Sequence, residues 1–178
     1  MDHGATTPLL QGTVEVDETY VGGKMKGGKP GRGSENKTPV VALIERNGKA
    51  RSKPVERVDA KSLKEEIRKH VDPSAKIMTD EWPSYQGIGN EFEGGHHVVN
   101  HGLGEYSRDD VHTNTAESYF ALLKRGHYGV FHSFSKEHLH RYCHEFSFRW
   151  NHRESADDIK RVEALRQVEG KRLYYKKP

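Results

Sequence analysis

The strongest constraint on the fold is an uninterrupted apolar segment, Val40–Ile44, in which every side chain is hydrophobic. Apolar side chains on both sides of an extended segment are typical of a buried central strand. The Asn47-Gly48 pair that follows is a hairpin signal and predicts another strand over about residues 51–58. Pro54 indicates that this strand has a free edge, because proline has no N–H to donate to a neighbour. The sheet is therefore predicted to begin with antiparallel strands.

An alternating segment, Thr13–Val21, precedes this hairpin and predicts a further strand. One side of this strand is apolar and the other is acidic, with Glu15, Asp17 and Thr19 on the acidic side. The segment from residue 22 to residue 37 is rich in glycine and lysine and predicts a mobile basic loop between the two strands.

Helices dominate the rest of the chain. Asp59 is expected to be the N-cap of a helix that runs to about His70. Short strands are expected over Lys76–Asp80 and about residues 97–100, and later helices over about residues 115–125, 136–152 and 156–169. The last helix is expected to turn four apolar side chains inward, namely Ile159, Val162, Leu165 and Val168. This mixed order predicts an α/β fold whose sheet is covered by helices.

Composition excludes several classes of protein. Cys143 is the only cysteine, which rules out an internal disulfide and a zinc site built from cysteines. No apolar run approaches the roughly 18 residues of a membrane span. The formal net charge of +3 over 178 residues is compatible with nucleic-acid binding without requiring it. The prediction is a soluble, cytoplasmic protein of one domain, or of one domain with a helical appendage.

Three carboxylates stand where they can meet. Asp17 lies on the acidic side of the first strand, Asp80 ends a later strand, and Glu117 lies in the first turn of a helix. Ligand sites in open α/β sheets lie at the carboxyl ends of strands, so the three side chains converge if the two strands are neighbours. Oxygen ligands suit Mg²⁺ or Mn²⁺. Two such ions can activate a water or a 3′-hydroxyl and stabilise the leaving oxygen of a phosphodiester.

Each acid also has a simpler explanation. Asp17 is an ordinary solvated residue if its side of the strand faces water. Asp80 can cap the turn before Pro83, and Asn114 with Glu117 has the spacing of a capping box. Other acids of the right type lie close in the sequence, namely Glu18, Glu81, Asp109 and Asp110.

The three acids lie in three ordered blocks of sequence. These are residues 15–23 (EVDETYVGG), 79–85 (TDEWPSY) and 112–117 (HTNTAE). The blocks resemble the active-site blocks of bacterial insertion-sequence transposases, most closely the ISXO2-like group. Residues 122–126 (LLKRG), 138–142 (HLHRY) and 145–149 (EFSFR) resemble the same group, so the similarity covers about residues 13–153. The 36 residues between Asp80 and Glu117 are close to the separation usual in DDE transposases.

The resemblance implies an RNase H-like catalytic domain over residues 13–153, between a disordered lead-in (1–12) and a C-terminal helix with a basic tail (154–178). It implies metal-dependent DNA cleavage and strand transfer, with Asp17 bridging two Mg²⁺ or Mn²⁺ ions and with Asp80 and Glu117 each completing one. Asn114 is an alternative third residue, but a carboxylate binds Mg²⁺ better than an amide does. Asn114 is then expected to cap the helix or to support the site.

Two other activities stay open at this point. One is a stand-alone RNase H-like nuclease, such as a resolvase or an RNase. The other is a catalytically silent remnant that at most binds DNA. Family members usually carry an upstream zinc ribbon with paired cysteines, and no cysteine pair precedes Asp17. The resemblance therefore does not extend to a module that recognises DNA ends.

The resemblance implies transposon ends and target DNA as partners. It also implies that several copies of the chain act together on the DNA, in the bacterial cytoplasm and associated with the nucleoid. Lys124 lies two helical turns beyond Glu117 on the same face and is expected, with Arg125, to contact the DNA backbone. Trp82 is expected either to stack on a base or to pack under its turn. The basic loop is expected to follow the backbone with four cations, namely Lys24, Lys26, Lys29 and Arg32.

Overall fold

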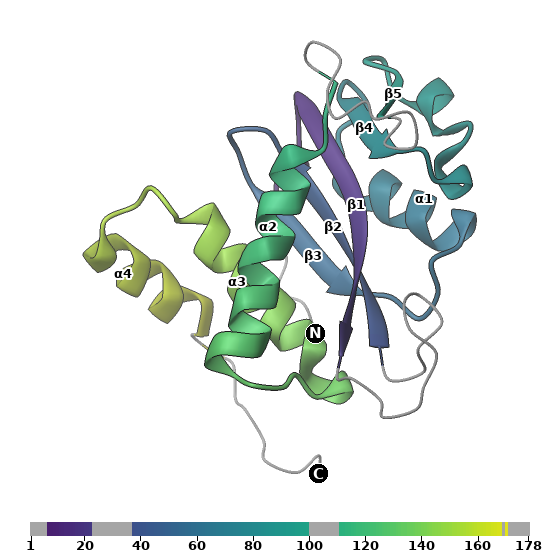
Figure 1. Cartoon of the computed structure of the whole chain (residues 1–178). Coiled ribbons are helices and arrows are strands. Elements are labelled where there is room, and N and C mark those ends of the chain that lie inside the picture. Colours follow the sequence, from purple (N-terminus) through teal and green to yellow (C-terminus); the bar gives the residue numbers. More distant parts are fainter. Residues whose placement is uncertain (1–6, 23–36, 100–110, 169, 171–178) are drawn as a thin grey trace, which may run out of the picture.

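The structure, a computed structural model, describes residues 7–22, 37–99, 111–168 and 170. The basic loop with Lys24, Lys26, Lys29 and Arg32 lies outside the described residues. In the described part, one five-stranded sheet has the strand order β3-β2-β1-β4-β5 (Figure 1). The strands are β1 (Thr13–Gly22), β2 (Lys37–Glu45), β3 (Ala50–Pro54), β4 (Lys76–Asp80) and β5 (His96–Val99).

Strand direction changes at the centre of the sheet. β1 pairs with β2, and β2 with β3, in antiparallel fashion, whereas β1 pairs with β4, and β4 with β5, in parallel. This is the predicted mixed, RNase H-like sheet flanked by helices, so the expected fold class is confirmed. The hairpin between β2 and β3 turns where predicted, with Asn47 in the left-handed region at φ 58°.

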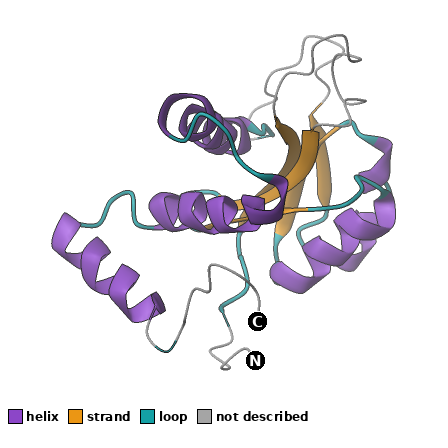
Figure 2. Cartoon of the chain, turned by 90° about the horizontal axis from the view of Figure 1, so that it is seen from below, coloured by secondary structure: helices purple, strands orange, loops and turns teal. Residues whose placement is uncertain are grey.

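Helices cover both faces of the sheet (Figure 2). α1 (Ala60–His70) packs on one face, while α2 (Asn114–Arg125) and α3 (Leu139–Asn151) pack on the other. α1 begins as predicted, because the Asp59 side chain accepts a hydrogen bond from the Ser62 amide at 2.9 Å. A π-helix (Gly126–Val130) continues α2, and short 3₁₀ helices cover Pro83–Tyr85, Ile88–Glu91 and Lys136–His138.

The apolar segment of β2 joins two hydrophobic cores. Val41 and Leu43 pack with Ile67 of α1, whereas Ala42 and Ile44 belong to the core formed with α2 and α3. This division follows from the two-residue period of a strand. It confirms that the segment is a buried central strand.

The C-terminal helix, α4 (Asp157–Val168), differs from its prediction. Its four large apolar side chains are 42–63% exposed rather than inward: Ile159, Val162, Leu165 and Val168. These residues are spaced by three, so they wind around the helix instead of forming one face. α2 and α3 already occupy the nearby face of the sheet, and α4 projects to one side of them (Figure 1).

Ordered packing also begins earlier than predicted. Leu10 falls in the range expected to be a disordered lead-in, yet it is fully buried and forms a bridge with Val71. Its amide donates to the His70 carbonyl at 2.9 Å. Burial of its side chain in the α1-side core offsets the entropy of ordering this segment. The prediction of disorder is therefore wrong at Leu10.

Candidate active site

The register between β1 and β4 sets two acids opposite each other. Thr13, Val14 and Glu15 pair with Lys76, Ile77 and Met78. The same register, continued two residues, brings Asp17 opposite Asp80. Opposite residues of parallel strands point to the same face of a sheet, so both carboxylates face the side covered by α2. The condition that the two strands be neighbours is met.

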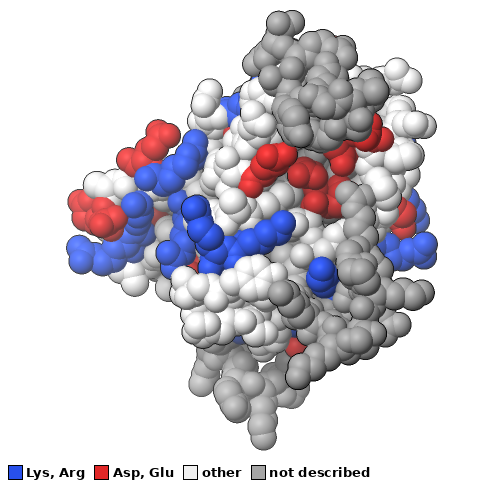
Figure 3. Space-filling view, viewed as in Figure 1, with Lys and Arg blue, Asp and Glu red and all other residues white. Residues whose placement is uncertain are grey.

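Glu117 reaches the same region from the first turn of α2. Its side chain is exposed, and both Asp80 and Glu117 exert an electrostatic repulsion on Asp17. Figure 3 shows acidic side chains gathered on this side of the molecule. The structure therefore places the three acids that the sequence singles out on the same side of the sheet, near enough for their charges to interact.

Asp17 bears the electrostatic cost of this arrangement. Burial raises the pKa of its carboxyl to about 7, and the neighbouring charges of Glu18, Asp80 and Glu117 push in the same direction. The Glu18 amide, which donates to Asp17 at 2.7 Å, only partly compensates. A carboxylate whose charge is this unfavourable gains most from a nearby cation.

The other acids near these residues in the sequence differ from them in the direction in which their side chains point or in their place in the fold. Glu18 is buried on the opposite face of β1, where the Tyr85 hydroxyl donates to its carboxylate at 2.7 Å. Glu81 is exposed in the turn after β4. Asp109 and Asp110 lie outside the described residues. Because successive side chains of a strand point to opposite faces, Asp17 faces α2 and Glu18 does not.

Asp80 also stabilises the turn that follows it. Its Oδ1 accepts a hydrogen bond from the Trp82 amide at 3.1 Å, as the simpler explanation predicts. This bond leaves Oδ2 free of that turn, so capping and metal binding are compatible. Trp82 itself is partly buried against the α1-side core. Trp82 is expected from the sequence either to stack on a base or to pack under its turn, and in the structure its indole packs under the turn.

The first turn of α2 is held in a way that the sequence does not predict. Thr113 is the N-cap and its side chain makes no capping hydrogen bond, so the predicted capping box is wrong. Instead, the buried carboxylate of Glu15 on β1 accepts from the amides of Thr115 at 2.8 Å and Ala116 at 3.0 Å. Asn114 is the exposed first residue of the helix. The acidic side of β1 is thus largely covered by protein rather than by water.

The donor set fits hard divalent ions in its chemistry. Three carboxylates offer only oxygen ligands, which is the preference of Mg²⁺ and Mn²⁺. Within the described residues, no group of three or more His, Cys, Asp or Glu side chains is gathered closely enough to hold a metal. Uncompensated carboxylates repel one another, and divalent cations would lower that repulsion.

Basic side chains lie beside the acids. Lys124 and Arg125 are exposed near the end of α2, and with Tyr128 they line a shallow hollow of about 530 Å³. Lys124 is about 10 Å from Glu117 along the helix axis. Figure 3 shows basic side chains adjoining the acidic ones on this face. An acidic cluster bordered by cations can accept a polyanion with its reactive phosphate at the acids.

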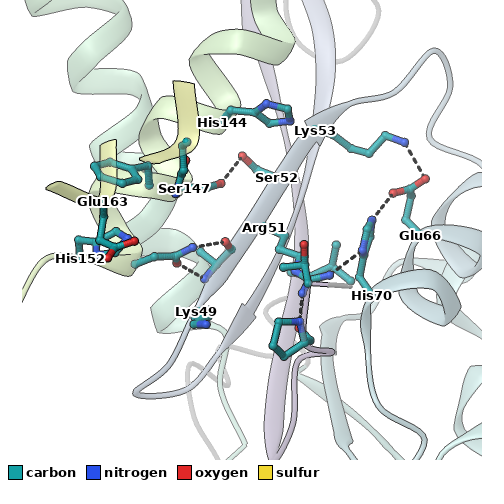
Figure 4. A pocket seen from close by; sticks show the side chains of 17 residues that line it. Lys49, Arg51, Ser52, Lys53, Glu66, His70, His144, Ser147, His152 and Glu163 are labelled. Carbon is teal, nitrogen blue, oxygen red and sulfur yellow. Dashed lines mark hydrogen bonds and ion pairs between the residues drawn. The ribbon is translucent and has the colours of Figure 1, made fainter. Parts of the chain in front are cut away.

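A larger hollow, of about 870 Å³, lies away from the acids along β3 (Figure 4). Several of its charged or polar side chains are hydrogen-bonded to one another. Lys53 donates to Glu66 at 2.8 Å, and Arg51 donates to Nδ1 of His70 at 2.8 Å. Because these cations are already paired within the fold, this hollow is a poorer candidate for binding DNA.

The strand order and the helices on both faces of the sheet define the class of RNase H-like folds. Residues 9–151 match the family of ISXO2-like transposase domains, and the chain belongs to this family. The match covers most of the chain and confirms the resemblance carried by the three sequence blocks.

The chain is similar to two known proteins. A Halobacterium salinarum protein described as "Uncharacterized protein in transposable element ISH50" is 31% identical over 163 residues, which cover 82% of this chain and 54% of the relative. The chain thus spans about half the length of this relative. A solved structure titled "Mos1 transposase paired-end complex with left transposon end" is 18% identical with a TM-score of 0.35, covering 79% of this chain and 54% of that chain. A likeness of that size does not bear on function.

Among the described residues, no helix is long and apolar enough to cross a membrane.

Proposed function

We propose that the chain is the catalytic core of a DNA transposase, in which Asp17, Asp80 and Glu117 bind two Mg²⁺ or Mn²⁺ ions. The observation that carries the proposal is the β1–β4 register, whose continuation by two residues beyond Glu15 and Met78 would set Asp17 opposite Asp80 on the face covered by α2. Family membership supports the same role. The ions would neutralise charge on the reacting phosphate and lower the pKa of an attacking oxygen.

The protein's own residues would supply position and charge. Lys124 and Arg125 would hold phosphates next to the acids, so that a DNA strand crosses the start of α2. Hydrolysis at the end of the element would free a 3′-hydroxyl. That hydroxyl would then attack a phosphodiester of the target, joining the strands and releasing the target's own 3′-hydroxyl. Two DNA ends must be joined, so several copies would act together, and a cytoplasmic, nucleoid-associated location stays a prediction.

A strand-transfer assay tests this proposal. The purified chain is incubated in Mn²⁺ with short duplexes that carry exposed 3′-hydroxyl ends and with a supercoiled plasmid. The proposal predicts covalent joining of duplex to plasmid, and predicts its loss in the Asp17→Asn, Asp80→Asn and Glu117→Gln variants. Plasmid nicking without joining, lost in the same variants, would identify a stand-alone nuclease instead.

One observation favours a second candidate, a non-catalytic module that binds DNA. Within the described residues the acids are not gathered into a ready metal site. This candidate predicts DNA binding that depends on Lys124 and Arg125, with no joining or nicking in Mn²⁺ or Mg²⁺. It also predicts that Asp17→Asn changes no measurable DNA-processing property.

A further inference from the structure

Glu15 is a buried carboxylate that joins the central strand to a distant helix. Its side chain is completely inaccessible to solvent. Besides the two amides of α2, it accepts a hydrogen bond from the Thr115 hydroxyl at 2.9 Å and from Nε of Arg46 at 2.6 Å. Nδ1 of His112 lies 3.3 Å from the same carboxylate. Among the described residues, these hydrogen bonds and ion pairs of the Glu15 carboxylate thus come from Arg46, from His112 and from the first turn of α2.

These contacts meet the needs of both partners. A carboxylate removed from water is costly unless it is fully hydrogen-bonded and paired with a cation. The first amides of a helix have no acceptor within the helix and carry partial positive charge. Glu15 therefore satisfies the start of α2, and the start of α2 with Arg46 satisfies Glu15.

Arg46 extends the same attachment to the residues before the helix. Its guanidinium donates to the His112 carbonyl at 2.8 Å, while its main-chain amide donates to Thr13 of β1 at 2.9 Å. The amide of Glu117 in turn donates to the Thr113 carbonyl at 3.1 Å. The whole first turn, including Glu117, is thus attached to β1 through Glu15 and Arg46.

This attachment is close to the acids. Glu15 and Asp17 lie on the same face of β1, about 7 Å apart along the strand. Glu117 directly follows Ala116, one of the two amides that Glu15 binds. One strand therefore carries both the residue that binds the start of α2 and the acid that Glu117 must face.

A role in helix stability alone would not need this arrangement. Thr113 and Asn114 are residue types that readily cap a helix locally. The Thr113 side chain makes no capping bond, and a distant acid takes that place. A local cap would satisfy the same amides without attaching the start of α2 to β1.

We propose that Glu15 is a positioning residue of the active site, which fixes the first turn of α2 to β1 and so holds Glu117 opposite Asp17. The inference rests on the proposed function, because it assumes that Asp17 and Glu117 share metal ions. Glu15 itself would not touch the metals or the DNA.

The test compares Glu15→Gln with a matched control, Glu66→Gln. Glu66 is also a buried acid, 7% exposed and paired with Lys53, but it lies on α1 on the other side of the sheet. The rates of amide hydrogen exchange at Thr115 and Ala116 measure directly whether their hydrogen bonds to Glu15 are present, since these amides have no acceptor within the helix. Mn²⁺ titration followed by electron paramagnetic resonance measures how the same substitution changes the Mn²⁺ affinity of Asp17, Asp80 and Glu117.

The proposal predicts that Glu15→Gln stays folded, that Thr115 and Ala116 exchange at least about tenfold faster, and that Mn²⁺ binds about 10–100-fold more weakly. Glu66→Gln should change neither. Wild-type exchange or wild-type Mn²⁺ affinity in a folded Glu15→Gln would overturn it. If that variant does not fold, Glu15→Asp, which keeps the charge but shortens the reach, must weaken Mn²⁺ binding for the proposal to stand.

Failure of the proposed function has a different signature. If the wild-type chain binds no Mn²⁺ with or without DNA, the metal site is wrong. The attachment is then judged by exchange alone: faster exchange in Glu15→Gln supports it, and unchanged exchange overturns it.

Discussion

Asp17 on β1 and Asp80 on β4 each lie two residues beyond the last paired residues of these parallel strands, Glu15 and Met78, on the face of the sheet that α2 covers. Neither acid is remarkable by itself, and the pairing of the strands gives them a common direction. Burial and the nearby carboxylates raise the pKa of Asp17 to about 7, from an ordinary value of 3.8. Without bound metal, the ionised form of Asp17 is therefore destabilised by burial and by the neighbouring carboxylates.

The first prediction concerns stability and pH. An acid whose pKa is higher in the folded state binds its proton more tightly there, so its contribution to stability falls as pH rises from about 4 to about 7. Asp17→Asn removes this penalty. The metal-free variant should be more stable than wild type above pH 7, by up to about 4 kcal/mol, with the difference vanishing near pH 4. Urea unfolding across this range measures it.

A half-buried acid at the surface provides the control for that experiment. Glu145 lies on the surface of α3 and pairs with Arg149, so Glu145→Gln should change stability by well under about 1 kcal/mol at any pH. If Asp17→Asn gave no more stabilisation at pH 8 than at pH 4, the raised pKa of Asp17 would be disproved.

The second prediction concerns DNA binding by α2. Lys124→Ala and Arg125→Ala should each weaken binding to duplexes of any sequence and reduce the salt dependence of the affinity by about one counterion. Lys61→Ala, an exposed lysine on α1 across the sheet, serves as the control. Fluorescence anisotropy at several salt concentrations measures both quantities. Equal salt slopes for all three variants and wild type would show that DNA does not contact α2.

The third prediction concerns the junction between α2 and α3. A Cβ at Gly126 would lie 1.9 Å from the Phe146 ring, whereas a Cβ at Gly129 would meet nothing within 4 Å. Gly126→Ala should therefore lower the free energy of unfolding by about 1–3 kcal/mol. Gly129→Ala in the same π-helix should be neutral or slightly stabilising. Denaturant unfolding of the pair tests whether α2 and α3 pack this closely, and equal stability would refute it.

The fourth prediction concerns Trp82. Its indole packs against the α1-side core, so Trp82→Ala should lower the free energy of unfolding by about 2–4 kcal/mol. Affinity for single-stranded DNA should not change at temperatures where the variant is folded. A selective loss of single-strand binding in a variant of wild-type stability would instead support base stacking by this residue.

Much of the fold follows from local patterns in the sequence. The apolar segment of β2, the Asn47 turn and the Asp59 cap each have one dominant physical explanation, and each appears where predicted. The position of β4 was predictable, but its partner was not. Pairing between strands more than fifty residues apart depends on the whole sheet, so the Asp17–Asp80 register needed the structure.

The errors arise where tertiary contacts override a local pattern. Asn114 and Glu117 have the spacing of a capping box, yet the helix is capped by Glu15, about a hundred residues away. The one available signal was that Glu15 shares a strand face with Asp17, which looked like an ordinary solvent face. The apolar residues of α4 looked like a buried stripe, but a spacing of three places Ile159 and Val168 on opposite sides of the helix.

The central claim is that Asp17, Asp80 and Glu117 form a divalent-metal site, and Mn²⁺ titration tests it most directly. Free Mn²⁺ is followed by electron paramagnetic resonance for wild type and for Asp80→Asn, with and without a DNA duplex. The account predicts Mn²⁺ binding by wild type, tightened by DNA, that is lost in the variant. Equal binding by the two proteins, or no binding by wild type even with DNA present, would contradict it.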